Sequence, residues 1–140
     1  MTAHDTNVLI YACDRSDPTR QRKAIELIEN STDGVLLWQV ACEFVAASRK
    51  LKAQGFTTDQ AWSRLKEFLD LFPLVLPTAA TLTRAEALTR DHRISFWDAM
   101  ILAACLEAGV QTFYSEDEPG LPRIGPLRIV NPFTEKTGTT

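Results

Sequence analysis

Apolar and polar positions follow two different periods along this chain. Short apolar runs bounded by turn-forming residues predict buried strands, and stretches with apolar residues every three to four positions predict helices. The expected strands are a very short segment before Asp5 and residues 35–38, 74–76, 112–114 and 127–130. The expected helices cover residues 7–11, 18–30, 40–54, 58–71, 81–90 and 96–108. Gly55 and Gly109 stand where a helix C-terminus favours glycine.

This alternation of strands and helices predicts an α/β fold, in which a mainly parallel sheet carries helices on both faces. A chain of 140 residues suits a single hydrophobic core. We therefore expect one domain over residues 1–133 and a polar, disordered tail over residues 134–140. In such sheets the active crevice lies at the carboxyl ends of the strands, so residues just after the strands are the first candidates for chemistry.

Composition narrows the classes of function. The apolar fraction of 45% and the charged fraction of 24% are those of an ordinary globular protein. No apolar run reaches the ~18 residues of a membrane span, and no N-terminal segment resembles a signal peptide, so we expect a cytoplasmic protein without a membrane partner. The cysteines Cys13, Cys42 and Cys105 form no CxxC motif, and the chain has two histidines. Neither a disulfide framework nor a zinc site is supported, and we expect buried free thiols.

The net charge of −3 argues against a protein that coats nucleic acid nonspecifically. It does not exclude a nuclease, because acids gathered in one pocket would leave basic clusters elsewhere to meet phosphates. Such clusters occur around residues 20–23, 49–52 and 90–93. Each of them could equally be a solvated helix face.

Three acidic residues lie where this fold would place chemistry, and a fourth lies on a neighbouring helix. Asp5 ends the first expected strand, and Asp117 closely follows the strand over 112–114. Asp98 lies in the first turn of a helix that is apolar on all sides, which predicts that this helix is buried. Glu43 belongs to the helix after the second strand. Clustered carboxylates repel one another unless a divalent cation neutralises them, and Mg²⁺ prefers such oxygen ligands. A site of this kind favours phosphodiester hydrolysis, and the sequence offers no GxSxG motif or evident Ser–His or Cys–His pair as a nucleophile.

Each acid also has a purely structural interpretation. Asp5 could cap a helix that begins at Thr6. Ser95 and Asp98 have the spacing of a capping box. Glu43 falls on a polar helix stripe, which by periodicity alone predicts an exposed residue, and residues 116–120 could form a solvated turn. The residues by themselves leave both interpretations open.

Three segments nevertheless resemble one known family. They are DTNVLIYA at residues 5–12, ISFWDA at 94–99, and YSED at 114–117 with VNPF at 130–133. In this order and spacing they resemble the PIN-domain family, and among its members the VapC-type toxins of bacterial toxin–antitoxin pairs. The resemblance spans nearly the whole chain. It implies an α/β/α sandwich that acts as a metal-dependent endoribonuclease on RNA, is often a homodimer, and is inhibited by a cognate antitoxin.

Carried over by motif, the resemblance assigns Mg²⁺ or Mn²⁺ to an acidic quartet. The matching residues, which would be both catalytic and metal-binding, are Asp5, Glu43, Asp98 and Asp117. Asn7 and Ser115 match polar neighbours that orient such ligands. Glu116 competes with Asp117 for the fourth acid, because only the register of the turn distinguishes them. One departure is the first strand, where His4 stands in a usually apolar segment and could weaken pairing or bring an imidazole to the site.

Two other classes are weighed against this prediction. A receiver domain also places acids at strand ends, but it needs an acidic pair after its first strand and an aspartate after a central one. The run over 74–76 is followed by no acid. The second alternative is a PIN-like module that binds RNA or a partner protein without cutting, against which the complete quartet argues.

Overall fold

The computed structural model describes residues 1–117 and 121–134, and it contains a six-stranded sheet. The strands are β1 (Thr2–His4), β2 (Gly34–Leu37), β3 (Leu74–Val75), β4 (Thr112–Tyr114), β5 (Arg123–Ile124) and β6 (Leu127–Val130). Their order is β3-β2-β1-β4-β6-β5. All neighbouring strands run parallel except β5, which pairs antiparallel with β6. The sheet is therefore mainly parallel, as the sequence predicts.

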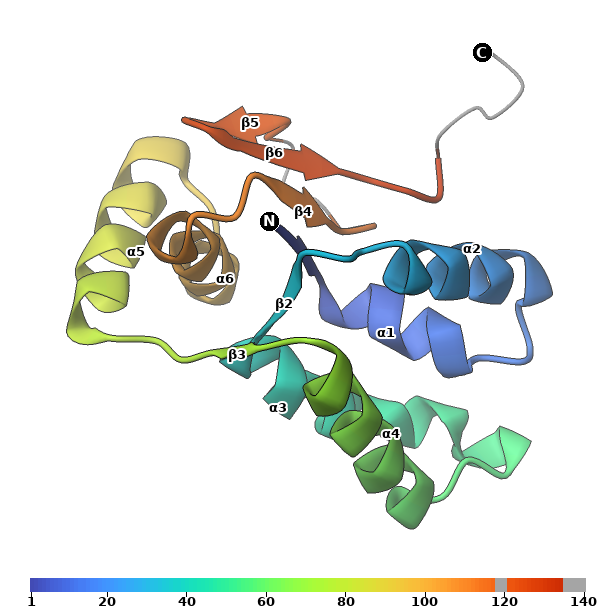
Figure 1. The fold of residues 1–140 in the computed structure, drawn as a ribbon. Coiled ribbons are helices and arrows are strands. Elements are labelled where there is room, and N and C mark those ends of the chain that lie inside the picture. Colours follow the sequence, from blue (N-terminus) through green and yellow to red (C-terminus); the bar gives the residue numbers. More distant parts are fainter. Residues whose placement is uncertain (118–120, 135–140) are drawn as a thin grey trace.

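Helices cover the sheet on both sides. They are α1 (Thr6–Cys13), α2 (Pro18–Glu29), α3 (Trp38–Ala47), the 3₁₀ helix η1 (Ser48–Gln54), α4 (Thr58–Leu71), α5 (Ala79–His92) and α6 (Phe96–Ala108). In Figure 1, α1 and α2 lie on one side of the strands, α5 and α6 lie on the other, and α3 and α4 pack near the β3 edge. This arrangement confirms the α/β class and the PIN-like sandwich that the resemblance implies.

The helix boundaries follow local chemistry that is visible in the sequence. α4 begins with a capping box between Thr57 and Gln60, and α6 begins after Ser95, whose hydroxyl accepts the N–H of Asp98 at 3.1 Å. Gly55 and Gly109 end their segments with φ of 83° and 79°, a conformation that costs glycine little. None of the described helices is long and apolar enough to cross a membrane.

Three predictions about local structure are corrected. The single helix expected over 40–54 ends at Ala47 and continues as η1, where the Ser48 hydroxyl donates to the backbone carbonyl of Val45 at 2.7 Å. β5 was not predicted, because two residues give no periodic signal. Cys42 is exposed, whereas Cys13 and Cys105 are the expected buried thiols. The predicted tail lies outside the described residues from 135 onward, and so do residues 118–120 of the predicted turn.

His4 is the last residue of the central strand β1, and it is buried. Its side chain is 3% exposed, its Nε2 lies 3.0 Å from the Ser31 hydroxyl, and its ring stacks on Tyr114. Burial lowers the pKa of His4 to about 4, so the imidazole is neutral at physiological pH. β1 pairs with both β2 and β4 through this segment. The strand is as short as the sequence predicts but pairs on both sides, and the imidazole packs against Ser31, Tyr114 and Phe72 and does not line the pocket.

Candidate active site

A pocket of about 560 Å³ opens at the carboxyl ends of β1 and β4. These strands are joined there by the backbone N–H of Asp5, which donates to the carbonyl of Tyr114 at 2.8 Å. The pocket is lined by α1, α3, η1, the start of α6 and the segment after β4. All four acids predicted from the sequence line it: Asp5, Glu43, Asp98 and Asp117. Parallel strands thus bring together residues that are far apart in the chain.

Asp5 is fixed by two hydrogen bonds at the floor of this pocket. Its Oδ1 accepts the N–H of Thr6 at 2.7 Å, and its Oδ2 accepts the Ser115 hydroxyl at 2.7 Å. Burial raises the pKa of the Asp5 carboxyl; the two hydrogen bonds oppose this, and the charges of Glu43 and Asp117 add to it. Asp5 therefore caps α1, as the structural interpretation predicts, and lines the pocket at the same time.

Glu43 is partly buried, although its helix period alone predicts an exposed residue. Its Oε1 accepts the Thr6 hydroxyl at 2.7 Å, and its Oε2 accepts Nε2 of Gln39 at 3.0 Å. The Gln39 amide also donates to the backbone carbonyl of Trp97 at 3.3 Å. The carboxylate of Glu43 is thus held toward α1, and its helix is linked to the start of α6.

Asp98 and Asp117 are exposed at the mouth of the pocket. No hydrogen bond from Ser95 N–H to the Asp98 carboxylate is found among the described residues, so the predicted capping box is only half formed. The Asp117 carboxylate accepts Nδ2 of Asn7 at 3.2 Å, and its backbone N–H donates to the Ser115 hydroxyl at 3.2 Å. Asp5, Asp98 and Asp117 also line a small adjoining cavity.

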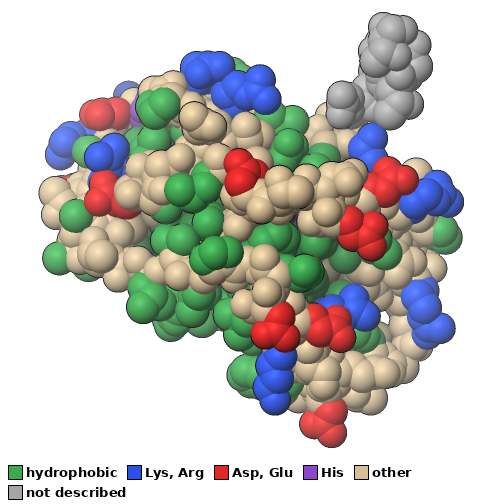
Figure 2. All heavy atoms as spheres, in the orientation of Figure 1, with side chains coloured by type: hydrophobic (Ala, Val, Ile, Leu, Met, Phe, Trp, Pro, Cys, Tyr) green, Lys and Arg blue, Asp and Glu red, His purple; other side chains and the backbone are tan. Residues whose placement is uncertain are grey.

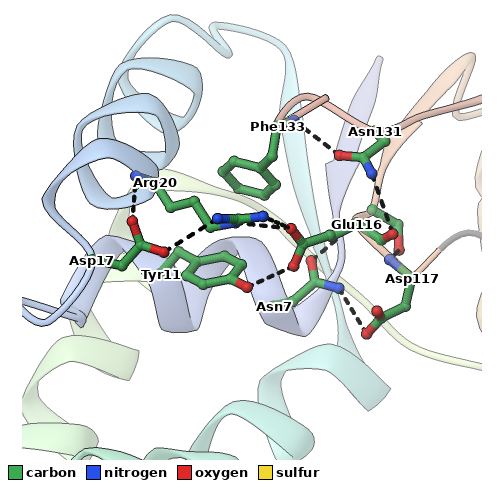
Figure 3. A network of polar contacts seen from close by, with 9 residues as sticks. Asn7, Tyr11, Asp17, Arg20, Glu116, Asp117, Asn131 and Phe133 are labelled. Carbon is green, nitrogen blue, oxygen red and sulfur yellow. Dashed lines mark hydrogen bonds and ion pairs between the residues drawn. The ribbon is translucent and has the colours of Figure 1, made fainter. Parts of the chain in front are cut away.

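The turn after β4 gives Glu116 and Asp117 different surroundings (Figure 3). The Glu116 carboxylate accepts the Tyr11 hydroxyl at 2.6 Å and Nε of Arg20 at 2.8 Å. Asp117 instead lies beside the amide of Asn7. Both residues line the pocket, but Glu116 already has a cationic partner.

The pocket carries a strong negative charge. Of its described lining residues, six bear a carboxylate, and Lys50 alone bears a positive charge. Carboxylate oxygens are the ligands that Mg²⁺ and Mn²⁺ prefer, so the donor set fits such an ion. Within residues 1–117 and 121–134, however, no three Asp, Glu, His or Cys side chains stand close enough together to hold a metal ion as they are placed.

The comparisons with known proteins agree with this geometry. The family model of the PIN domain matches residues 4–125. The chain belongs to the PIN domain family. No curated protein matches the sequence.

Solved structures with the same fold include three at 19% sequence identity. A toxin–antitoxin complex from Klebsiella pneumoniae has a TM-score of 0.70 and covers 94% of this chain and 98% of that one. VapBC2 from Rickettsia felis, bound to a DNA fragment from its promoter, has a TM-score of 0.68 and covers 93% and 97%. Mycobacterium tuberculosis VapC20, a sarcin-ricin loop cleaving toxin, has a TM-score of 0.64 and covers 81% and 87%. At this identity the likeness shows the fold alone.

Sequence reasoning missed several residues that shape the site of this PIN domain. Thr6 and Gln39 hold Glu43, and the only signals were the position of Thr6 in the first motif and the four-residue spacing of Gln39 from Glu43. Arg20 was read as a phosphate contact or a solvated residue, whereas it pairs with Glu116 across the fold. Lys50, from the second basic cluster, does line the pocket.

Proposed function

We propose that this PIN domain is a metal-dependent endoribonuclease and the toxin of a toxin–antitoxin pair. The observation that carries this proposal is the charge of the pocket, whose described lining has one lysine and six carboxylates, of which Glu116 alone is paired with an arginine. Such a pocket repels the phosphates of RNA unless a divalent cation is bound there. Asp5, Glu43, Asp98 and Asp117 would hold Mg²⁺ or Mn²⁺. When bound, the ion lowers the pKa of a bound water and offsets charge that develops on the phosphate.

The residues around the acids would orient them. Ser115 and the N–H of Thr6 fix both oxygens of Asp5, and Asn7 directs the Asp117 carboxylate. The described lining contains no histidine or cysteine, so the lining offers neither group as general base or thiol nucleophile. A water bound to the metal, rather than a thiol, would then attack the phosphate.

The test is RNA cleavage by the purified 140-residue chain with Mg²⁺ or Mn²⁺, with excess EDTA, and with metal restored. We expect cleavage only with metal, and loss of cleavage in Glu43→Gln. Cleavage at full rate in excess chelator would refute the metal mechanism. A melting temperature that rises with Mn²⁺ while no RNA is cut would instead favour the non-catalytic PIN-like module.

The fold neighbours support an antitoxin partner, since two of them were solved as toxin–antitoxin assemblies. The acidic pocket would suit an inhibitory segment that presents an Arg or Lys to the carboxylates. Co-expression with the adjacent open reading frame tests this. We expect a stable complex and relief of toxicity, and a neighbour that neither binds nor protects would count against the proposal.

We also propose that the chain forms a homodimer. Hydrophobic side chains gather around β3 and the start of α5 (Figure 2), where the exposed ones are Leu71, Leu74, Leu76 and Leu82. An exposed apolar patch of this kind is typical of an interface. Light scattering coupled to gel filtration should give twice the chain mass, and Leu76→Lys should lower it. A monomeric wild-type protein at all concentrations would contradict this.

A further inference from the structure

Every polar atom of Glu116 has a hydrogen-bond partner in another segment (Figure 3). The Tyr11 hydroxyl donates to its Oε1 at 2.6 Å, and the Nε and Nη2 of Arg20 each lie 2.8 Å from its Oε2. Its backbone N–H donates to Oδ1 of Asn7 at 3.4 Å, and its carbonyl accepts Nδ2 of Asn131 at 3.3 Å. Residue 116 is therefore tied to α1, to α2 and to the segment after β6.

Arg20 is itself held by several groups. Its guanidinium lies 5.4 Å from the ring centre of Tyr11 and 5.8 Å from that of Phe133, and these two rings pack edge to face. Its Nη1 also donates to the Asp17 carboxylate at 3.3 Å. A cation packed against two aromatic rings and paired with two carboxylates has less freedom than a solvated arginine. These contacts restrict the Arg20 guanidinium, and through it the Glu116 carboxylate.

The contacts that hold Glu116 are linked through Asn7 to the side chain of Asp117. Asn7 accepts the N–H of Glu116 with its carbonyl oxygen and donates to the Asp117 carboxylate with its amide nitrogen. One asparagine side chain therefore makes a hydrogen bond to each of these two residues of the turn. A slip of the turn by one residue would put either Glu116 in the place of Asp117 or Asp117 in the place of Glu116.

We propose that Arg20 and Tyr11 are positioning residues, which hold Glu116 so that the turn after β4 presents Asp117 to the metal site. The inference rests on the proposed function, because it assigns a purpose to the placement of Asp117. Arg20 does not line the pocket, and the hydroxyl of Tyr11 is engaged by Glu116. They act through Glu116 and the backbone of the turn.

Charge and position predict opposite results for Arg20. A positive charge near a cation site weakens cation binding, so a purely electrostatic role means that removing Arg20 tightens Mn²⁺ binding. A positioning role means that removing it weakens binding. A double variant, Arg20→Met with Glu116→Gln, keeps the net charge and prevents residue 116 from acting as a carboxylate ligand. Because Glu116 also lines the pocket, a positioning role requires weaker Mn²⁺ binding together with faster exchange in the turn.

The matched control is a second ion pair far from the pocket. Arg84 on α5 lies 2.6 Å from Glu107 on α6, with side chains 47% and 30% exposed, compared with 40% and 20% for Arg20 and Glu116. The control double variant is Arg84→Met with Glu107→Gln. Each protein is studied as the whole chain, by hydrogen–deuterium exchange over residues 113–117 in EDTA and by calorimetric titration with Mn²⁺. Melting temperatures in EDTA monitor the fold.

We expect faster exchange in the turn and roughly 10-fold weaker Mn²⁺ binding in the Arg20–Glu116 variant, the scale typical of residues that orient metal ligands. The control should change neither, even if both variants lose similar thermal stability. Arg20→Lys, which keeps the charge but not the planar fork, should fall between wild type and the double variant.

The outcomes separate this inference from the proposed function. If wild type binds Mn²⁺ and the Arg20–Glu116 variant binds it equally well, the positioning role is overturned and the metal site stands. Tighter binding in Arg20→Met without faster exchange would also overturn it, in favour of a purely electrostatic role. If wild type binds no Mn²⁺, the proposed function fails, and the positioning role in it fails as well, whatever the exchange shows.

Discussion

Replacing Asp98 by asparagine separates a metal ligand from a helix cap, the two interpretations that the sequence leaves open. In the structure the cap of α6 uses the backbone N–H of Asp98 and the hydroxyl of Ser95. Asp98→Asn keeps that bond and removes only the carboxylate charge. The substitution is close to isosteric, so it tests the charge with little change in packing.

The expected cost to stability is small. A favourable charge in the first turn of an exposed helix end contributes about 0.3–1 kcal/mol. Asp98 lines the small cavity together with Asp5 and Asp117, so removing one negative charge also relieves repulsion. The net change should stay below about 1 kcal/mol, or roughly 4 °C in melting temperature for a chain of this size. Cleavage should fall far more, by at least the ~10–100-fold seen when residues that merely orient a ligand are lost.

Asp59 provides the matched control. It is an exposed acid in the first turn of α4, it does not line the pocket, and the Thr57 capping box beside it stays intact. Asp59→Asn should therefore lose at least as much stability in EDTA as Asp98→Asn, as measured by thermal melting, because only Asp98→Asn also relieves repulsion. Only Asp98→Asn should lose RNA cleavage at saturating Mn²⁺. A lower melting temperature with near wild-type cleavage in Asp98→Asn would show that Asp98 serves the helix and not the metal.

Three further changes test other parts of the structure. Ser115→Ala leaves Asp5 without one of its donors at a site 1% exposed, so we expect a loss of about 1–3 kcal/mol in urea unfolding and at least ~10-fold slower cleavage. Gly34→Ala would place a Cβ 2.6 Å from the Phe72 ring, so urea unfolding should show a loss of about 1–3 kcal/mol, while cleavage per folded molecule is unchanged. The pKa of His4 is about 4 when folded and 6.5 in its unperturbed state, so the unfolded chain binds the extra proton between these values. The free energy of unfolding should fall by about 3 kcal/mol as pH drops from 6.5 to 4, and His4→Gln should remove that part of the slope in a urea series in EDTA.

The fold was predictable wherever local signals act alone. The bounds of α4 and α6 match the prediction because Thr57 and Ser95 cap their first turns, Pro73 follows the end of α4, and Gly109 ends α6. The 3₁₀ continuation after Ala47 was missed because apolar periodicity continues through it. Strand order was not predictable residue by residue, since β1 pairs with β4 through contacts that no local pattern encodes. The exposure of Cys42 likewise depends on which face of α3 meets the core.

The site was predictable in its composition and not in its contacts. The rule that places chemistry at strand ends pointed to Asp5, Asp98 and Asp117, the family resemblance added Glu43, and all four line one pocket in the structure. Helix periodicity failed for Glu43 because its exposure is set by Thr6, 37 residues away in the chain. The register of Glu116 and Asp117 depends on Asn7 and Arg20, which lie near the other end of the sequence. Contacts between residues so far apart in the chain cannot be predicted from local sequence patterns.

The donors that hold the acids explain how such a pocket can persist without a bound cation. Six carboxylates around one cavity repel one another, and burial adds a further cost for Asp5. Thr6, Asn7 and Ser115 each donate to a carboxylate of the pocket, and these bonds offset part of that cost. Removing Asp98, which makes no cap or ion pair with its carboxylate among the described residues, should therefore spare the metal-free fold, whereas removing a donor should weaken both the fold and the site. We expect this asymmetry if the acids serve cation binding. If they served stability alone, replacing them would destabilise the protein.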